Sequence, residues 1–219
     1  MIKLESLDRA EALRYLGGAK TEPDEKMTSL LNDCEARLLS AAKPGYLYKI
    51  ISLPCEWLFV GEDIKNHLAD CRSAALICAT LGAEVDKLIR VSQITDMPRA
   101  VVINSLAAVA IEQVCDKIEE KLSAIFPESY FTFRYSPGYG DFPIELQKSF
   151  LSELDAPRKI GLSANSSHIL TPSKSVTAVI GISSQPIEAK KRGCAVCNLR
   201  KTCRYRRNGE HCGFYSLFK

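Results

Sequence analysis

The chain has 219 residues, of which 46% are apolar and 25% charged, and a net charge of +3. This composition is typical of a globular protein with a real core and excludes disordered, collagen-like and coiled-coil chains. The longest uncharged stretch with a helical pattern, residues 100–111, is too short to span a membrane. The N-terminus reaches acidic residues at once and lacks the apolar core of a secretory signal, so we expect a cytoplasmic protein.

The charge is distributed unevenly. Residues 187–219 carry nine Lys and Arg against two Glu, a net charge of +7, whereas residues 1–186 carry a net charge of −4. Such a basic tail suits an acidic partner, which is a nucleic acid, an anionic protein surface or an anionic metal cluster within the tail itself. A solvated basic end that binds nothing is the alternative. We therefore predict two domains, 1–186 and 187–219.

Apolar spacing, helix caps and Gly or Pro breaks divide residues 1–186 into short elements. The clearest is a long helix over 97–125, with Asp96 as its N-cap, Pro98 in its first turn and burial on more than one side over 100–111. Further helices are predicted over 8–16, 23–42, 61–71, 72–81, 84–91 and 144–154. Strands are predicted over 46–53, 57–60, 131–135, 160–162, 168–170 and 176–182. Helices followed by strands, with few βαβ units, favour an α+β fold over a doubly wound parallel sheet.

Nine cysteines, an odd number, indicate a reducing compartment. Five of them have mostly apolar surroundings and are interpreted as small buried hydrophobes: Cys34, Cys55, Cys71, Cys78 and Cys115. The other four lie in the tail with the spacing C-x2-C-x5-C-x8-C: Cys194, Cys197, Cys203 and Cys212.

Four thiolates so close in sequence predict one metal centre in the tail. We favour an iron–sulfur cluster, with zinc as the alternative, and His211 is a possible substitute for Cys212 as a ligand. The surrounding Arg and Lys side chains would offset the negative charge of the thiolates. The other interpretation is a set of free or disulfide-linked thiols in a basic tail.

Residues 134–143 form an R-x3-G-Y-x3-P loop. Pro137 and Gly138 suit the central positions of a type II turn, and glycines let the backbone approach a ligand. Arg134 has the geometry to fork onto a carboxylate, and Tyr139 to lie against a flat or cationic group. From spacing alone, the loop is either a binding loop or a plain turn.

The loop resembles the signature of the activation domain of cobalamin-dependent methionine synthase, which binds S-adenosylmethionine. The resemblance covers roughly residues 1–186 and includes five further segments: 13–17, 71–86, 96–112, 160–162 and 173–178. It implies mixed helices packed on a largely antiparallel sheet. It also implies that Arg134 holds the carboxylate of S-adenosylmethionine, that the backbone of Gly138 and Tyr139 approaches its adenosine part, and that Glu112 lies near its amino end. Pro137 belongs to the same loop and is counted among the cofactor-binding residues.

The chain also departs from this family. Residues 175–178 read Ser-Val-Thr-Ala where the family usually has Ser-x-Ser-Gly, and the tyrosine-bearing segment that follows in full-length enzymes is replaced by the cysteine tail. None of His67, His168 and His211 fits the cobalamin signature D-x-H-x-x-G. Cobalamin would therefore be held by a partner, a corrinoid-carrying methionine synthase subunit.

The function that the resemblance implies is support of reductive methylation of the partner's cobalamin. An iron–sulfur cluster in the tail would relay an electron from an electron-donor protein to the partner's cobalamin. The alternative is a zinc-knuckle module that binds nucleic acid or protein, with Tyr205, Phe214 and Tyr215 available for base stacking. A third interpretation is a homologue that keeps the fold and has lost ligand binding.

Overall fold

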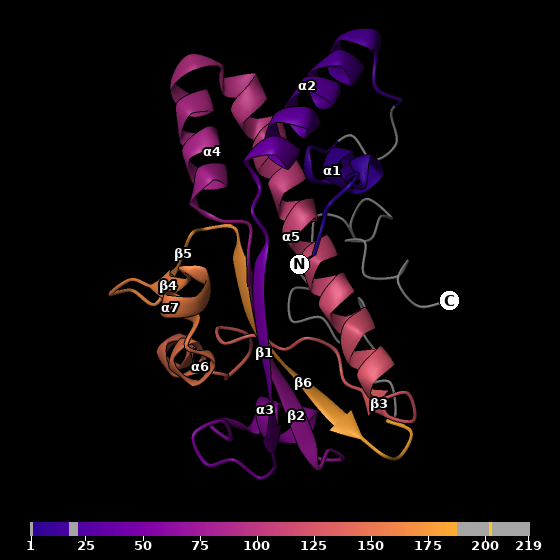
Figure 1. The fold of residues 1–219 in the computed structure, drawn as a ribbon, viewed down its shortest axis with the longest axis vertical. Helices are drawn as coiled ribbons and strands as arrows, with labels where there is room; N and C mark the ends of the chain where they lie inside the picture. The colour runs from indigo at the N-terminus through magenta and orange to yellow at the C-terminus, as the bar shows by residue number, and fades with distance from the viewer. Residues whose placement is uncertain (1, 18–21, 188–201, 203–219) are drawn as a thin grey trace. The chain divides into compact units, whose positions relative to one another are not determined.

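The structure is a computed structural model that describes residues 2–17, 22–187 and 202 (Figure 1). The chain divides into two units, Met1–Gln185 and Pro186–Lys219. The first unit is described below. The four tail cysteines lie outside the described residues, so the predicted metal module stays a prediction.

A four-stranded antiparallel sheet forms the middle of the first unit. Its strands, in spatial order, are β1 (Gly45–Ser52), β2 (Ser73–Thr80), β6 (Ser175–Ser183) and β3 (Tyr130–Phe131). β2 pairs along its whole length on both sides, with Ser73 opposite Ser52 of β1 and Ile182 of β6. A separate two-stranded sheet consists of β4 (Ser163–Ala164) and β5 (Leu170–Thr171). The α+β fold with an antiparallel sheet is confirmed.

On one side of the sheet, the long helix α5 (Met97–Ile125) contacts β2 and β6. Three further helices pack against α5 and form with it the long-helix layer: α1 (Arg9–Tyr15), α2 (Glu25–Ala41) and α4 (Ala83–Thr95). The carboxylate of Asp96 caps α5 by accepting a hydrogen bond from the Arg99 amide at 3.1 Å, as predicted. Both Ile103 and Leu106 of α5 are fully buried in this layer, in one core with Ile77 of β2. None of the helices in the described part is long and apolar enough to cross a membrane.

Short elements cover the other face of the sheet and form the loop layer. They are α3 (Glu62–His67), a 3-10 turn η1 (Ile144–Leu146), α6 (Gln147–Leu154) and α7 (Ala156–Ile160). Their core contains Phe142 and Phe150 together with Leu76 of β2 and Val179 of β6. Successive residues of β2 thus enter different cores, Leu76 on this side and Ile77 on the side of α5.

The helix predicted over 72–81 is wrong, because this segment is β2, an inner strand with a neighbour on each side. All of its residues after Ser73 are buried, since helices cover both faces of the sheet. A strand buried on both faces is a continuous apolar run, which periodicity alone does not distinguish from a buried helix.

Four of the predicted strands also need correction. Residues 57–60 are not a strand but turns and irregular chain. Ile160 ends α7, and Gly161 follows in a left-handed conformation, so the predicted strand at 160–162 is wrong and β4 starts one residue later. The strand predicted at 168–170 is displaced to Leu170–Thr171, after His168 with a positive φ of 61°. The strand predicted at 131–135 is reduced to β3 and a single bridge at Tyr135.

The cysteines of this unit fit the prediction in part. Cys34, Cys78 and Cys115 are buried, whereas Cys55 and Cys71 are half-buried. Burial raises the pKa of Cys78 and of Cys115 to about 12, so both thiols stay protonated and pack as apolar groups.

Candidate functional site

The R-x3-G-Y-x3-P loop closes in a tight turn. The carbonyl of Ser136 accepts a hydrogen bond from the Tyr139 amide at 3.3 Å, and Gly138 between them has a φ of +95°. This positive φ at the third turn position is what a type II turn requires and what glycine adopts without strain. The Gly138 amide donates to the carbonyl of Phe142 at 2.7 Å, and the Phe142 side chain is buried. The loop is therefore anchored in the core beneath it.

Two aspartates fasten the loop to α3. The carboxylate of Asp141 accepts hydrogen bonds from the amides of Glu62 at 2.7 Å and Asp63 at 3.1 Å. In return, the Asp63 carboxylate accepts from the Asp141 amide at 3.2 Å. A Cβ atom at Gly140 would collide with the Asp63 carboxylate, so this close approach requires glycine. The loop thus supplies the cap that α3 lacks within its own sequence.

Successive side chains before the turn contact different layers. Tyr135 stacks on His67 of α3, with ring centroids 4.9 Å apart, and on Phe142, at 5.9 Å. Arg134 instead forms ion pairs with α5. The segment therefore joins the loop layer to the long-helix layer, and Arg134 is the side chain at this junction.

Three carboxylates of α5 surround the Arg134 guanidinium. Its Nη2 lies 3.0 Å from Glu112, and its Nη1 lies 2.9 Å from Asp116 and 3.1 Å from Glu119. These carboxylates follow one another at i, i+4 and i+7, so they share one side of the helix. The Arg134 side chain is 18% exposed and the Glu112 side chain 50% exposed. Arg134 therefore contacts three carboxylates on one side of α5.

Titration of Glu112 reflects these surroundings. Burial raises its pKa, the Arg134 guanidinium lowers it, and the carboxylates of Asp116 and Glu11 raise it further, with a net upward shift. The pKa of Arg134 is raised in spite of burial, because the facing carboxylates, Glu119 first, favour its charged form. The carboxylates of α5 therefore stabilise the charged form of Arg134.

The short helix α1 brings a second group of side chains to Glu112. The Ser105 hydroxyl of α5 donates to the carbonyl of Ala12 at 2.7 Å, which fixes α1 against α5. Glu11 and Tyr15 of α1 both interact electrostatically with Glu112. Burial and the neighbouring Glu11 raise the pKa of Tyr15, so its hydroxyl stays protonated and able to donate.

The structure brings some of the predicted site residues together and not others. Arg134 and Glu112 are in direct contact. Pro137, Gly138 and Tyr139 lie in the turn, and no hydrogen bond in the described part joins them to that pair. The Tyr139 side chain is 66% exposed, and its carbonyl accepts from the hydroxyl of Tyr135 at 3.3 Å. The turn therefore presents Tyr139 to solvent rather than to the ion pairs.

Sequence analysis missed four side chains of this region: Glu11, Tyr15, Asp116 and Glu119. A signal for the last two was available, because they follow Glu112 at helical spacing within a confidently predicted helix. Nothing in the sequence indicated that α1 would contact the same place, since that depends on tertiary packing.

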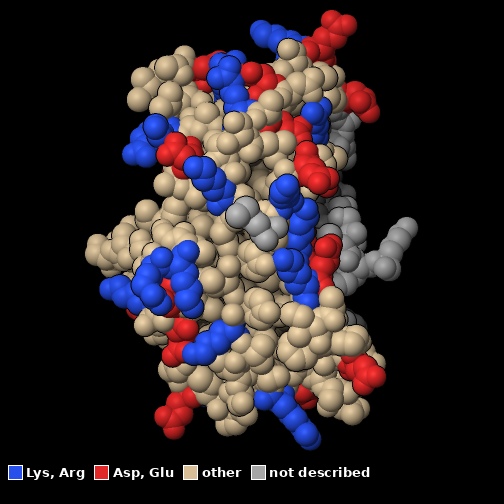
Figure 2. All heavy atoms as spheres, in the orientation of Figure 1, with Lys and Arg blue, Asp and Glu red and all other residues tan. Residues whose placement is uncertain are grey.

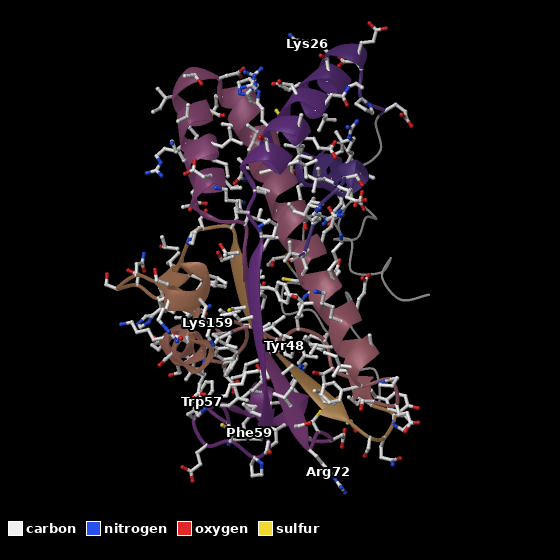
Figure 3. All side chains as sticks on the ribbon, in the orientation of Figure 1. Lys26, Tyr48, Trp57, Phe59, Arg72 and Lys159 are labelled. Atoms are coloured by element: carbon white, nitrogen blue, oxygen red, sulfur yellow. The ribbon has the colours of Figure 1, made fainter. Side chains whose placement is uncertain are left out.

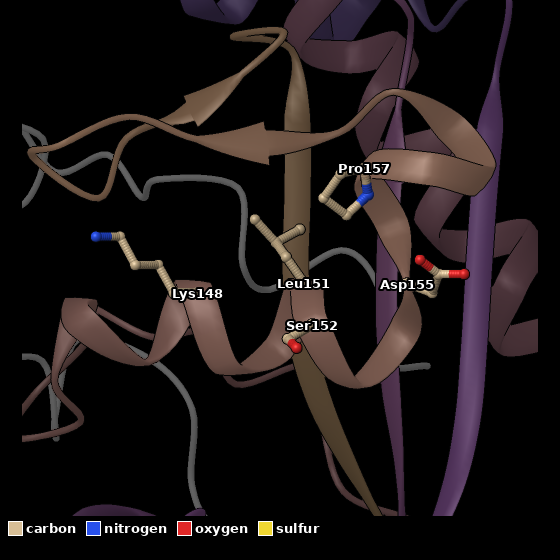
Figure 4. Close-up of a pocket in the computed structure, with 5 residues that line it drawn as sticks. All are labelled: Lys148, Leu151, Ser152, Asp155 and Pro157. Carbon is tan, nitrogen blue, oxygen red and sulfur yellow. The ribbon is translucent and has the colours of Figure 1, made fainter.

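Two surface hollows lie elsewhere. One, of about 300 Å³, is lined by Lys148, Leu151, Ser152, Asp155 and Pro157 of α6 and α7 (Figure 4). The other, of about 670 Å³, is lined by residues of α2 and the start of α5, where Arg99 pairs with Asp33 and Asp96. Neither hollow includes the candidate site. Among the described residues, no group of three or more His, Cys, Asp or Glu side chains is arranged to hold a metal ion.

The fold is similar to a solved structure described as the MetH reactivation domain bound to AdoHcy, S-adenosylhomocysteine. The TM-score is 0.56 at 15% sequence identity, over 94% of this chain and 82% of the other. No protein-family model matches the chain, and no curated protein matches it. At this identity the likeness establishes the fold, an α+β arrangement of helices on an antiparallel sheet.

Proposed function

We propose that this chain binds S-adenosylmethionine through the Arg134–Tyr139 loop and α5, and supports reductive methylation of cobalamin carried by a separate protein. The observation that carries the proposal is the ion pair of Arg134 with Glu112 next to the G-Y turn, within a fold similar to the MetH reactivation domain. That domain was crystallised with S-adenosylhomocysteine, the product of methyl transfer from S-adenosylmethionine.

The charges of the site suit the cationic parts of this ligand. S-adenosylmethionine carries a sulfonium and an ammonium group, and both are attracted to the carboxylates of Glu112, Asp116 and Glu119. S-adenosylhomocysteine lacks the sulfonium charge. We therefore expect the site to prefer S-adenosylmethionine, because only this ligand has a sulfonium charge that is attracted to these carboxylates.

The ligand carboxylate has to compete for Arg134. In the structure the guanidinium contacts three carboxylates. Binding therefore exchanges at least one of these for the ligand carboxylate, and Glu112 is the natural one to turn toward the ligand's ammonium group. Glu112 is half exposed, so it moves at little cost in packing.

The chemistry that this site supports is positioning. When the ligand is bound, the reacting methyl group is carried by the sulfonium, and the nucleophile is the partner's cobalt. The side chains of this chain would bind and orient S-adenosylmethionine, and no acid or base is needed. The partner is a corrinoid-carrying methionine synthase subunit, and the electron comes from a donor protein, with a tail cluster as relay.

Calorimetry of the anaerobically purified protein tests the binding proposal. Titration with S-adenosylmethionine should give one site per chain, and titration with S-adenosylhomocysteine a weaker one. Absence of binding heat with both ligands would contradict the proposal and indicate a protein that has the fold and lacks the ligand site. Equal affinity for both ligands would contradict the role given to the carboxylates of α5.

Metal analysis tests the tail. Cys194, Cys197, Cys203 and Cys212 would hold one iron–sulfur cluster, or zinc as the alternative. Iron, sulfide and zinc are to be measured on the anaerobic protein and on Cys197→Ser, with Cys55→Ser as the matched control. We expect a near-stoichiometric metal centre that only Cys197→Ser loses. If the parent protein contained neither iron nor zinc, the proposed metal centre would be wrong, and the tail would carry four thiols without a metal.

A further inference from the structure

β1 ends the sheet with an open edge. It pairs with β2 along eight residues, from Gly45 opposite Thr80 to Ser52 opposite Ser73. Within the described part of the chain, no backbone group is hydrogen-bonded to the outer edge of β1. Figure 1 shows this edge along the front of the molecule. A long edge strand with free N–H and C=O groups is a template for one more strand.

The two faces of β1 differ in chemistry beside this edge. On the α5 face, Tyr46 packs against the core, whereas Tyr48 and Ile50 are 41% and 37% exposed. Figure 1 shows the reason, since α5 runs obliquely away from β1 and leaves this end uncovered. On the opposite face, the exposed Lys49 lies beside α6, where it pairs with Glu153 at 2.7 Å.

Positive charge flanks the strand on both sides. Lys121 of α5 donates to the Tyr46 hydroxyl at 2.7 Å and lies 4.8 Å from that ring. Lys159 belongs to α7, which contacts β1, and it has no ion pair with any described residue. Lys and Arg side chains, with some Asp and Glu, border a band without charged side chains on this face of the molecule (Figure 2), and Tyr48 and Lys159 are both visible from this side (Figure 3).

These charges select among the possible occupants of the edge. A second copy paired antiparallel about the middle of β1 would bring Lys49 against its own equivalent, and like charges across an interface are repelled. Residues 187–219 of this chain carry a net charge of +7 and would be repelled in the same way. An acidic segment gains from Lys159, and from Lys49 in exchange for its pair with Glu153.

We propose that the outer edge of β1 binds an extended acidic segment of a partner protein, which adds as a fifth strand to the sheet. The backbone of that segment pairs with β1, its apolar side chains lie beside Tyr48 and Ile50, and its acidic side chains lie beside Lys49 and Lys159. Because successive residues of a strand face opposite sides, the segment alternates apolar and acidic residues. This surface is separate from Arg134 and does not depend on S-adenosylmethionine binding.

Fluorescence anisotropy with the full-length protein tests this proposal. The probe is a fluorescein-labelled eight-residue peptide of alternating valine and glutamate, and a peptide of alternating valine and lysine is its control. A third peptide carries N-methyl groups on alternate amides, which removes backbone pairing and keeps the charge. We expect measurable binding of the first peptide alone, weakened by salt.

Charge reversals locate the contact. Lys49→Glu and Lys159→Glu should each weaken binding of the valine–glutamate peptide at least about threefold, whereas Lys87→Glu on α4 should leave it unchanged. Hydrogen exchange should show slower exchange of amides within residues 46–52 when the peptide is bound. S-adenosylmethionine titrations of the same variants should be unaffected.

Four results would overturn the proposal. They are equal binding of the acidic and basic peptides, no binding of either, binding that survives N-methylation, and equal effects of Lys159→Glu and Lys87→Glu. Sedimentation that shows a dimer of this chain with β1 protected would assign the edge to a second copy instead.

Discussion

The two faces of the sheet are covered in different ways. On one face, α5 and its neighbouring helices bury long apolar stripes, with Ile103 and Leu106 fully buried. On the other, short elements are held in place by single polar contacts, such as Asp141 with the amides of α3 and Gln147 with Thr177 at 2.5 Å. Burial of apolar surface stabilises the first layer. In the second layer, a few hydrogen bonds hold the loop in position. The candidate site lies where Arg134 joins the two.

The largest expected effect is a loss of stability in the long-helix layer. Leu106→Ala should lower the free energy of unfolding by about 2–5 kcal/mol, because it leaves a cavity in a fully buried position. Urea unfolding followed by circular dichroism measures it. Val101→Ala, a change at a 49% exposed position on the same helix, should cost less than about 0.5 kcal/mol. Similar costs for the two variants would show that this layer is not packed as described.

A smaller effect on stability, with a larger effect on the site, is expected in the loop layer. Asp141→Asn should cost about 0.5–2 kcal/mol, the range for a lost helix cap, because the amides of Glu62 and Asp63 lose a charged acceptor. S-adenosylmethionine affinity should fall as well, since the turn at Gly138 is released. Glu145→Gln, an exposed change close in sequence, is the control for both measurements. Unchanged affinity of Asp141→Asn for S-adenosylmethionine would show that binding does not require the contacts that anchor the loop to α3.

The smallest effect concerns Glu112 and depends on pH. Burial raises the pKa of Glu112 above its value in the unfolded chain, so ionisation of this carboxyl group opposes folding. Its contribution to the free energy of unfolding is fully present below the unfolded pKa and is lost as pH rises through the folded pKa. Glu112→Gln should therefore match the wild type at low pH and become slightly more stable toward neutral pH. The gain should stay below about 1 kcal/mol because the side chain is half exposed.

Urea unfolding of Glu112→Gln and the wild type, from low to neutral pH, measures the difference in their free energies of unfolding. Asp116→Asn, at a carboxylate that also contacts Arg134, is the matched control. A variant that is less stable than the wild type at neutral pH would show that the ion pair with Arg134 outweighs the burial of Glu112. Weaker S-adenosylmethionine binding by the same variant would separate the functional role of Glu112 from stability.

The same contrast explains what the sequence could predict. The long helix was predictable to within a residue because Asp96 caps it, Pro98 opens it and its apolar stripe is periodic. β2 was not, because a strand covered on both faces has no alternation to detect. The short strands β4 and β5 depend on pairing with each other rather than on their own residues.

For the candidate site, the residue pattern predicted the turn, and Gly138 and the Ser136 carbonyl form it. The resemblance implied that Arg134 and Glu112 each contact the ligand, which stays a prediction, and their direct ion pair was not predicted. The further carboxylates on Arg134 and the approach of Glu11 from α1 were not predicted, because they arise from the packing of distant segments.

The most direct test of the account is an anaerobic calorimetric titration of S-adenosylmethionine into the wild type, Arg134→Ala and Arg158→Ala. Arg158 is a matched arginine, 80% exposed and paired with Asp155. We predict one site in the wild type, unchanged in Arg158→Ala and weakened in Arg134→Ala by about 1.5–3 kcal/mol, roughly 10- to 150-fold in affinity. Circular dichroism should first establish that each variant is folded at the titration temperature. Equal affinity of Arg134→Ala and the wild type would contradict the account.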